Sequence, residues 1–134
     1  MTQRKRRPRR RAGNKEQSHR LIGWLVSYQN DEMGESHEIR SGRTLISSKN
    51  GLDGKVIELH EQSIAAPHSA MNASPQHQLV LQDIFSPSGT FLQRSADKDE
   101  SKVNGPIEVH HGDWIRIGEQ TKFQVCLIDA PHRM

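Results

Sequence analysis

The apolar residues of this chain fall in short segments, which limits what it can fold into more than any other feature. From Leu21 onward, turn sequences such as KNGLDG, VNGP and HHGD separate these segments. Several segments alternate apolar and polar residues with a period of two, as in Trp114–Ile117, which is typical of half-buried strands. No segment keeps a helical apolar stripe for three turns. The pattern predicts an all-β fold, an antiparallel β-sandwich, with strands at 23–28, 37–41, 44–47, 55–59, 64–71, 78–84, 90–94, 107–109, 114–118 and 122–128.

Charge divides the chain into a basic N-terminal tail and a mildly acidic body. The 134 residues carry a formal net charge of +3. Residues 1–20 hold nine Lys or Arg and one Glu, a net charge of +8, whereas residues 21–134 hold ten Lys or Arg and fifteen Asp or Glu, a net charge of −5. We expect the sandwich to occupy residues 21–130, between the tail at 1–20 and a short C-terminal tail at 131–134.

The basic tail has no apolar stripe that would repay ordering, so we expect it to be disordered in isolation. One interpretation is a solubilising terminus. Another is an electrostatic arm for nucleic acid, an anionic lipid surface or an acidic protein. A nuclear-import address and a fold-back onto the acidic body also stay open. The residues that would contact a polyanion are Arg4, Lys5, Arg6, Arg7, Arg9, Arg10 and Arg11.

The sequence lacks the common signatures of enzymes and cofactor sites. It has no GxSxG elbow, no Walker loop and no dinucleotide-binding glycine fingerprint. His110 and His111 would point to opposite faces of a strand, and the single cysteine leaves no spaced zinc ligand set. We predict that the protein is not an enzyme and that it holds no metal and no cofactor.

Cysteine usage and hydropathy indicate the compartment. Cys126 has no partner for an internal disulfide, which suits a reducing compartment. No apolar stretch is long enough to span a bilayer, and none follows the basic start as a signal peptide requires. We expect a soluble cytoplasmic protein with no transmembrane segment.

Four motifs of the body occur in a specific order. They are GRTLISS (42–48), IELHEQSIAAPHSAM (57–71), LVLQDIFSPSGTFL (79–92) and VNGPIEVHHGDWIRIG (103–118). In this order the body resembles a forkhead-associated (FHA) domain. That family has a strand ending in Ile-Gly-Arg, a Ser-x-x-His-Ala segment, a Ser-x-Asn-Gly-Thr turn and a late Gly-Asp-x-Ile-x-Ile-Gly strand. The resemblance implies a β-sandwich whose loops bind phosphothreonine peptides.

The resemblance also implies where the phosphopeptide contacts should fall. A phosphate needs charge-assisted donors. The family supplies them chiefly from the arginine of Ile-Gly-Arg and the serine of Ser-x-x-His, and it holds the peptide backbone with the asparagine of Ser-x-Asn-Gly-Thr. Those three positions are Ser48, Ala65 and Ser88 in this chain. The resemblance therefore predicts a degenerate site, which lacks the arginine, one hydroxyl and the asparagine. The segment from Ser48 to Ala65 also looks longer than is usual for the family.

We take the loops around these positions as candidate peptide-binding elements, with Lys49 as a substitute cation. The candidates are Ser47, Ser48, Lys49, Ala65, Ala66, Ser86, Ser88, Thr90 and Asn104. We expect structural roles for His68, Gly89, Gly112 and Asp113.

A charged insertion over residues 92–103 (LQRSADKDESKV runs from Leu92) departs from the family pattern. It has mixed charges and no apolar period, which favours a solvated hairpin extension. Because the insertion borders the candidate loops, the alternative is that it covers or replaces the candidate site.

These observations favour a non-catalytic adaptor module for protein interactions in intracellular signalling or assembly. We expect weak or no dependence on phosphothreonine. The alternatives are an FHA protein that does bind phosphothreonine peptides, and a binder of nucleic acid or anionic surfaces through the basic tail. The expected partners are proteins that present a phosphorylated or acidic peptide, and a homodimer stays open.

Overall fold

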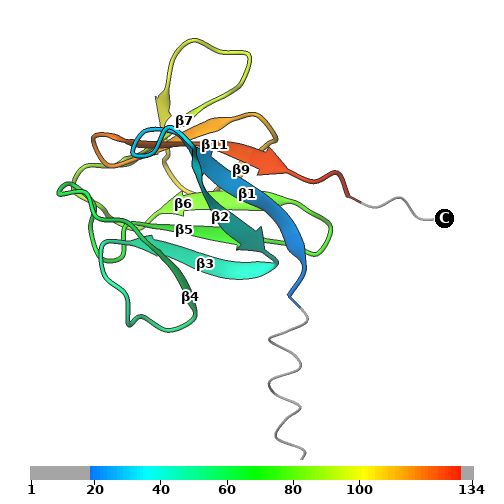
Figure 1. Ribbon diagram of the computed structural model, residues 1–134, viewed down its shortest axis with the longest axis horizontal. Coiled ribbons are helices and arrows are strands. Elements are labelled where there is room, and N and C mark those ends of the chain that lie inside the picture. Colours follow the sequence, from blue (N-terminus) through cyan, green and yellow to red (C-terminus); the bar gives the residue numbers. More distant parts are fainter. Residues whose placement is uncertain (1–18, 131–134) are drawn as a thin grey trace, which may run out of the picture.

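The computed structural model describes residues 19–130, which form two packed sheets (Figure 1). One sheet has the strand order β2-β1-β11-β10-β7-β8 and the other β4-β3-β5-β6-β9. The strands are β1 (Leu21–Ser27), β2 (Glu35–Arg40), β3 (Gly42–Ser47), β4 (Lys55–Glu58), β5 (Ser69–Ala73), β6 (Leu79–Asp83), β7 (Thr90–Gln93), β8 (Ser101–Lys102), β9 (Ile107–Val109), β10 (Trp114–Ile117) and β11 (Thr121–Leu127). The predicted all-β sandwich is confirmed.

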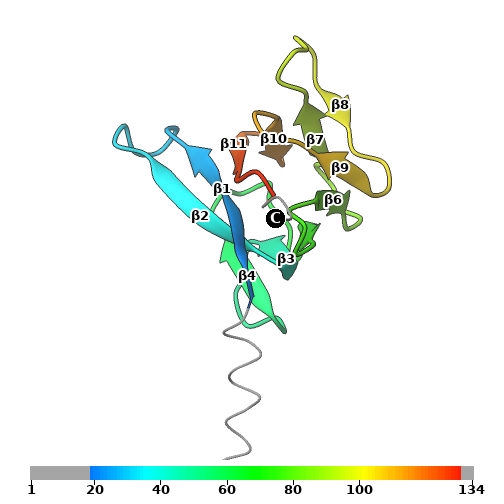
Figure 2. The same ribbon diagram turned by 90° about the vertical axis from the view of Figure 1, so that its right-hand side faces the viewer.

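Strand pairing is antiparallel throughout the described residues, except that β4 runs parallel to β3. The first and last strands are neighbours, since β1 pairs with β11 along Gly23–Val26. In Figure 2 the two sheets are seen from the side, with β8 at the far edge of the sheet that contains β7 and β10. A single core lies between the sheets and fixes them relative to each other. The loops that connect the strands therefore start and end at fixed positions.

The core comes from the alternation already visible in the sequence. Strand β10, for example, buries Ile115 and Ile117 and leaves Trp114 and Arg116 half-buried. The largest buried apolar side chains are Phe123, Ile22, Leu25, Ile39, Ile46, Met71, Leu79, Leu81, Ile115, Ile117 and Val109.

One predicted strand begins later than expected. The apolar segment 64–71 was predicted to be extended throughout, but β5 begins only at Ser69. Pro67 has no N–H for a ladder. The N–H of Ala65 donates instead to the His68 side chain, at 2.9 Å. Residues 64–68 are therefore part of a loop.

The loops of interest gather at the end of the sandwich where β3 and β6 finish. We call this set the recognition loops: 48–54, 59–68, 84–89 and 118–120. They contact one another through Ser48 N to Ala65 O, at 3.0 Å, and Gly118 N to Gly89 O, also at 3.0 Å. The described chain begins at the other end of the sandwich, opposite the recognition loops. There Leu21 pairs with Arg40, which lies beside the start of β3.

The charged insertion is a hairpin extension, because β7 pairs with the two-residue strand β8. Two of its side chains bind β10 and the turn before it. Glu100 pairs with Arg116 of β10 at 2.9 Å, and Arg94 pairs with Asp113 at 2.8 Å. These contacts favour the solvated extension over a cover for the recognition loops.

The predicted disordered tail at 1–20, with its polyanion-binding residues, falls outside the described residues except for residues 19 and 20, and the predicted C-terminal tail at 131–134 falls outside them entirely. Within residues 19–130, no helix is long and apolar enough to cross a bilayer.

Candidate peptide-binding loops

Asp83, the last residue of β6, organises the loop that leads into β7. Its carboxylate accepts hydrogen bonds from the Ser86 hydroxyl, from the Ser86 N–H at 3.0 Å and from the Thr90 hydroxyl at 2.6 Å. Ser86 Oγ then accepts the N–H of Gly89, whose φ of +88° suits a residue without a side chain. Burial by itself would raise the pKa of Asp83, but the hydrogen bonds from Ser86 and Thr90 outweigh it and hold that pKa below its ordinary value. The loop is thus built around an ionised carboxylate.

His68 joins this loop to the preceding one. Its imidazole is fully buried, and its Nδ1 accepts the N–H of Ala65 at 2.9 Å. Nε2 therefore carries the proton and donates it to the carbonyl of Gly89, at 2.8 Å. These two bonds hold the loop at Ala65 against the loop at Gly89.

Ser88 makes the second tie between the loops. Its hydroxyl donates to the carbonyl of Ser63 at 2.6 Å. The Ser63 hydroxyl in turn donates to Glu61 at 2.7 Å and accepts the N–H of Glu119 at 2.8 Å. The Ser88 hydroxyl therefore donates its proton within the protein, so it cannot donate it to a peptide.

The structure brings the first two phosphate-contact positions together. Ser48 and Ala65 are both half-buried and share the backbone hydrogen bond given above. Ser48 brings a neutral hydroxyl and Ala65 brings no polar side-chain group. Lys49 is exposed next to them, with its N–H bonded to Ser47 Oγ at 3.1 Å.

Two of the predicted peptide contacts are corrected by their burial. Ser47 and Thr90 are both 0% exposed, so neither reaches the surface of the loops. Ser47 Oγ accepts the Lys49 N–H, and Thr90 is held by Asp83 and by the Ser69 hydroxyl at 2.7 Å. Both residues hold the loops in shape. Among the other candidates, Lys49, Ala66 and Asn104 are exposed, while Ser48, Ala65, Ser86 and Ser88 are half-buried.

A negative charge lies beside these positions. Burial tends to raise the pKa of Glu61, but hydrogen bonds from Ser63, Gln120 and Thr121 outweigh it and leave the pKa below its ordinary value. The ionised Glu61 carboxylate is bonded to Ser63, the residue whose carbonyl receives the Ser88 hydroxyl. An ionised carboxylate at this place opposes the approach of a phosphate dianion.

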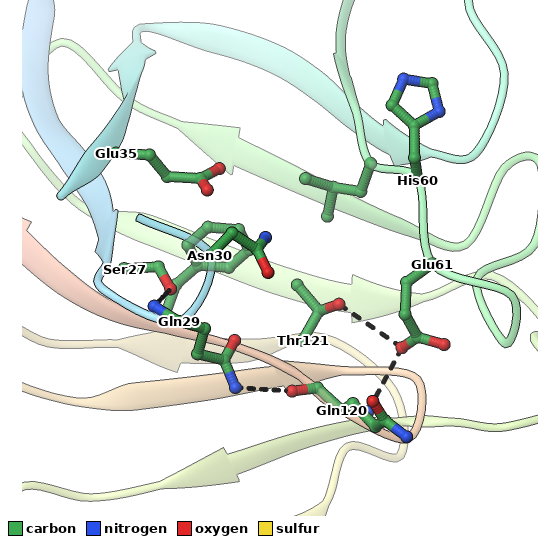
Figure 3. A pocket seen from close by; sticks show the side chains of 10 residues that line it. Ser27, Gln29, Asn30, Glu35, His60, Glu61, Gln120 and Thr121 are labelled. Carbon is green, nitrogen blue, oxygen red and sulfur yellow. Dashed lines mark hydrogen bonds between the residues drawn. The ribbon is translucent and has the colours of Figure 1, made fainter. Parts of the chain in front are cut away.

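A cavity of about 370 Å³ lies beside Glu61, between the recognition loops and the hairpin that joins β1 to β2 (Figure 3). The side chains of Glu35 and Asn30 face Glu61 across it. The described residues that line it are mostly polar and include no Lys or Arg: Ser27, Gln29, Asn30, Glu35, Leu59, His60, Glu61, Gln120, Thr121 and Phe123. It offers a phosphate no lysine or arginine.

Gly112 and Asp113 shape the turn that precedes β10. Gly112 has a φ of +91° and turns the chain into β10. The Asp113 carboxylate, buried in this turn, accepts hydrogen bonds from Arg94 and from the N–H of His110, both at 2.8 Å. Among the described residues there is no group of three or more His, Cys, Asp or Glu placed to hold a metal ion.

Phe85 is a surface residue that the sequence did not single out. It lies in the loop between β6 and β7, is 99% exposed and has a φ of +47°. The predicted strand at 78–84 ends one residue before Phe85, and neither the exposure nor the backbone conformation of Phe85 was predicted from the sequence. An aromatic residue directly before a Ser-x-x-Gly-Thr turn was the available signal.

No protein-family model and no curated protein sequence matches the chain, whereas solved structures do match its fold. The FHA domain of an Arabidopsis thaliana hypothetical protein superimposes with a TM-score of 0.64 at 19% identity, covering 86% of this chain and 92% of that one. The FhaA FHA domain, complexed with the intracellular domain of Rv3910, gives a TM-score of 0.59 at 21% identity, covering 78% and 98%. The chain has the FHA fold. The FHA domain of human APLF, in complex with an XRCC1 bisphospho peptide, gives a TM-score of 0.61 at 16% identity, covering 79% and 99%.

The FHA resemblance drawn from four sequence motifs is thereby confirmed for the fold. At these identities, what the chain binds has to be argued from its own residues.

Proposed function

We propose that the protein is a non-catalytic FHA-type adaptor module, which binds a segment of a protein partner on its recognition loops with little or no dependence on phosphothreonine. It would act in intracellular signalling or assembly, in the cytoplasm. The observation that carries the proposal is the set Ser48, Ala65 and Ser88, which stands where the FHA resemblance expects arginine, serine and asparagine. No member is cationic, and the Ser88 proton is bonded to Ser63.

The expected loss of phosphate-binding free energy at these positions supports the proposal. A hydrogen bond to a charged group is worth about 1.5–3 kcal/mol, so two missing bonds weaken phosphate binding by roughly a hundredfold or more. The ionised Glu61 nearby lowers phosphate affinity further. Lys49 is exposed and would have to supply the missing charge by itself.

Paired peptides test the proposal. The full chain is titrated with a phosphothreonine peptide library and with the same peptides unphosphorylated, at about 0.3 M salt to screen the basic tail. We expect equal affinities for each pair. The matched control is the full chain with its seven cations at 4–11 changed to glutamine, which separates tail binding from loop binding. Micromolar binding that disappears without the phosphate would establish the alternative, an ordinary phosphothreonine-binding FHA protein.

A second function is favoured by the tail, where seven of the eight residues at 4–11 are basic. Such a segment suits nucleic acid or an anionic surface, with the sandwich as a scaffold. Binding of a DNA duplex or an anionic vesicle should fall steeply with salt for the full chain and should be lost in the glutamine variant. Equal binding by both proteins contradicts this function.

A further inference from the structure

Phe85 is held in a conformation that costs the folded state free energy. A φ of +47° is uncommon for any residue with a side chain, and for a bulky one it is a true outlier. At 99% exposure the ring makes almost no packing contact in return. Glycine would occupy the same position without the steric cost. The reason for a phenylalanine here is therefore not found within the fold.

His77, which also has a positive φ among the described residues, shows the contrast. Its φ is 68°, but it is 8% exposed and its ring is bonded on both nitrogens, to Arg20 at 2.7 Å and to the carbonyl of Ile128 at 2.7 Å. At His77 the fold itself compensates the backbone conformation. At Phe85 nothing described in the fold does.

The backbone on both sides of Phe85 is fixed. The N–H of Ile84 donates to the carbonyl of His68 at 2.9 Å, and Ser86 is bonded to Asp83 by its N–H and by its hydroxyl. The ring is thus presented from a loop that is already ordered. Because its backbone is already ordered, this loop loses little backbone conformational entropy when a partner covers the ring.

Phe85 is also continuous with the proposed binding surface, because Ser86 and Ser88 lie on the same loop. We propose that Phe85 is an aromatic anchor of the recognition loops, and that the protein partner bound there presents an apolar pocket that receives its ring. This inference rests on the proposed function and names the chemistry of the partner. Recognition is then driven by burial of an aromatic side chain, a common source of interface hot spots, in place of phosphate.

Site-specific photo-crosslinking in cells that express the full chain tests the inference. The photoreactive p-benzoylphenylalanine replaces Phe85 in one variant, Lys49 in a second and Met33 in a third. Lys49 reports on the recognition loops, whereas Met33 is an 86% exposed apolar residue on the hairpin between β1 and β2. Adducts are identified by mass spectrometry.

We expect one and the same partner protein to be crosslinked from positions 85 and 49 and not from position 33. In purified form that partner should bind Phe85→Gly about thirtyfold more weakly than the unaltered chain, as is typical for loss of an aromatic hot spot. Met33→Gly should leave its affinity unchanged. The urea midpoint of Phe85→Gly should be higher than that of the unaltered chain.

Each other outcome overturns a defined part of the reasoning. An adduct from position 49 without one from position 85 leaves the proposed function standing and refutes the anchor. No adduct from either position refutes both. An adduct between two copies of this chain identifies a homodimer contact and refutes a separate partner. A lower urea midpoint for Phe85→Gly shows that the ring stabilises the fold, which removes the argument.

Discussion

If the loops keep the shape of a phosphopeptide site and have lost only its donors, restoring the donors should restore binding. The change is the double substitution Ser48→Arg and Ala65→Ser in the full chain. The hydrogen bond from Ser48 N to Ala65 O keeps the two positions side by side, so the new guanidinium and hydroxyl would face the same phosphate. Ser88 is left in place, because its hydroxyl ties the loop to Ser63.

The expected gain follows from the number of bonds restored. Each hydrogen bond to a charged group contributes about 1.5–3 kcal/mol, and the lower figure applies because both positions are only half-buried. Two such bonds give about 3 kcal/mol, an increase in affinity for phosphopeptide of roughly 150-fold. The ionised Glu61 nearby makes the measured gain smaller rather than larger.

Fluorescence anisotropy with the phosphothreonine library, at about 0.3 M salt, measures the gain. The matched control is Asn50→Arg with Ala65→Ser, which adds the same charge to the same loop at an exposed position. The first variant should gain affinity only for phosphorylated peptides, and the control should gain little for either form. Equal gains in both variants would mean that charge alone is responsible. No gain in a variant that keeps the native urea midpoint would refute the claim that the loop shape is retained.

Three further predictions concern the stability of the loops. Asp83→Asn should lower the free energy of unfolding by about 1–3 kcal/mol near pH 7. Because the pKa of Asp83 is depressed in the folded state, its carboxylate stabilises the fold above the ordinary pKa of 3.8, and this stabilisation is lost as the pH falls through the lower folded pKa. Urea titrations of the two proteins should therefore converge in acid. His68→Ala should cost about 2–4 kcal/mol, since it leaves the bonds to Ala65 and Gly89 unmade and opens a cavity; a loss under 1 kcal/mol contradicts the tie. Phe85→Gly should stabilise the fold by about 1 kcal/mol in the same assay.

Much of the fold was predictable because its signals are local. Alternation along a strand such as β10 and the glycine turns between strands depend on a few neighbouring residues, and they were enough for the sandwich. A structural role for His68 was predicted from its place in the segment that resembles the family's Ser-x-x-His, and its two hydrogen bonds fit that role. The extent of β5 was not, because Ala65 gives its N–H to a side chain that has to be placed first.

The candidate site was less predictable, because it depends on which way each loop side chain faces. Ser47 and Thr90 have hydroxyls and lie in the right loops, but both point into the protein. The Ser88 hydroxyl donates to the carbonyl of Ser63, which lies 25 residues earlier in the chain. The exposure and positive φ of Phe85 occur in a loop whose next residue, Ser86, is hydrogen-bonded back to Asp83. None of these contacts has a sequence period that would reveal it.

The loops keep the residues that shape them and lack the phosphate donors that the FHA resemblance expects. The residues that shape the loops, Asp83, His68 and Gly89, all keep their internal hydrogen bonds. The positions without a donor are those that would contact phosphate. Decay without a remaining use would also let Phe85 give way to glycine, which suits its backbone better. A loop that keeps its supports and carries a strained, exposed aromatic ring fits the binding surface proposed above, in which apolar contact takes the place of charge.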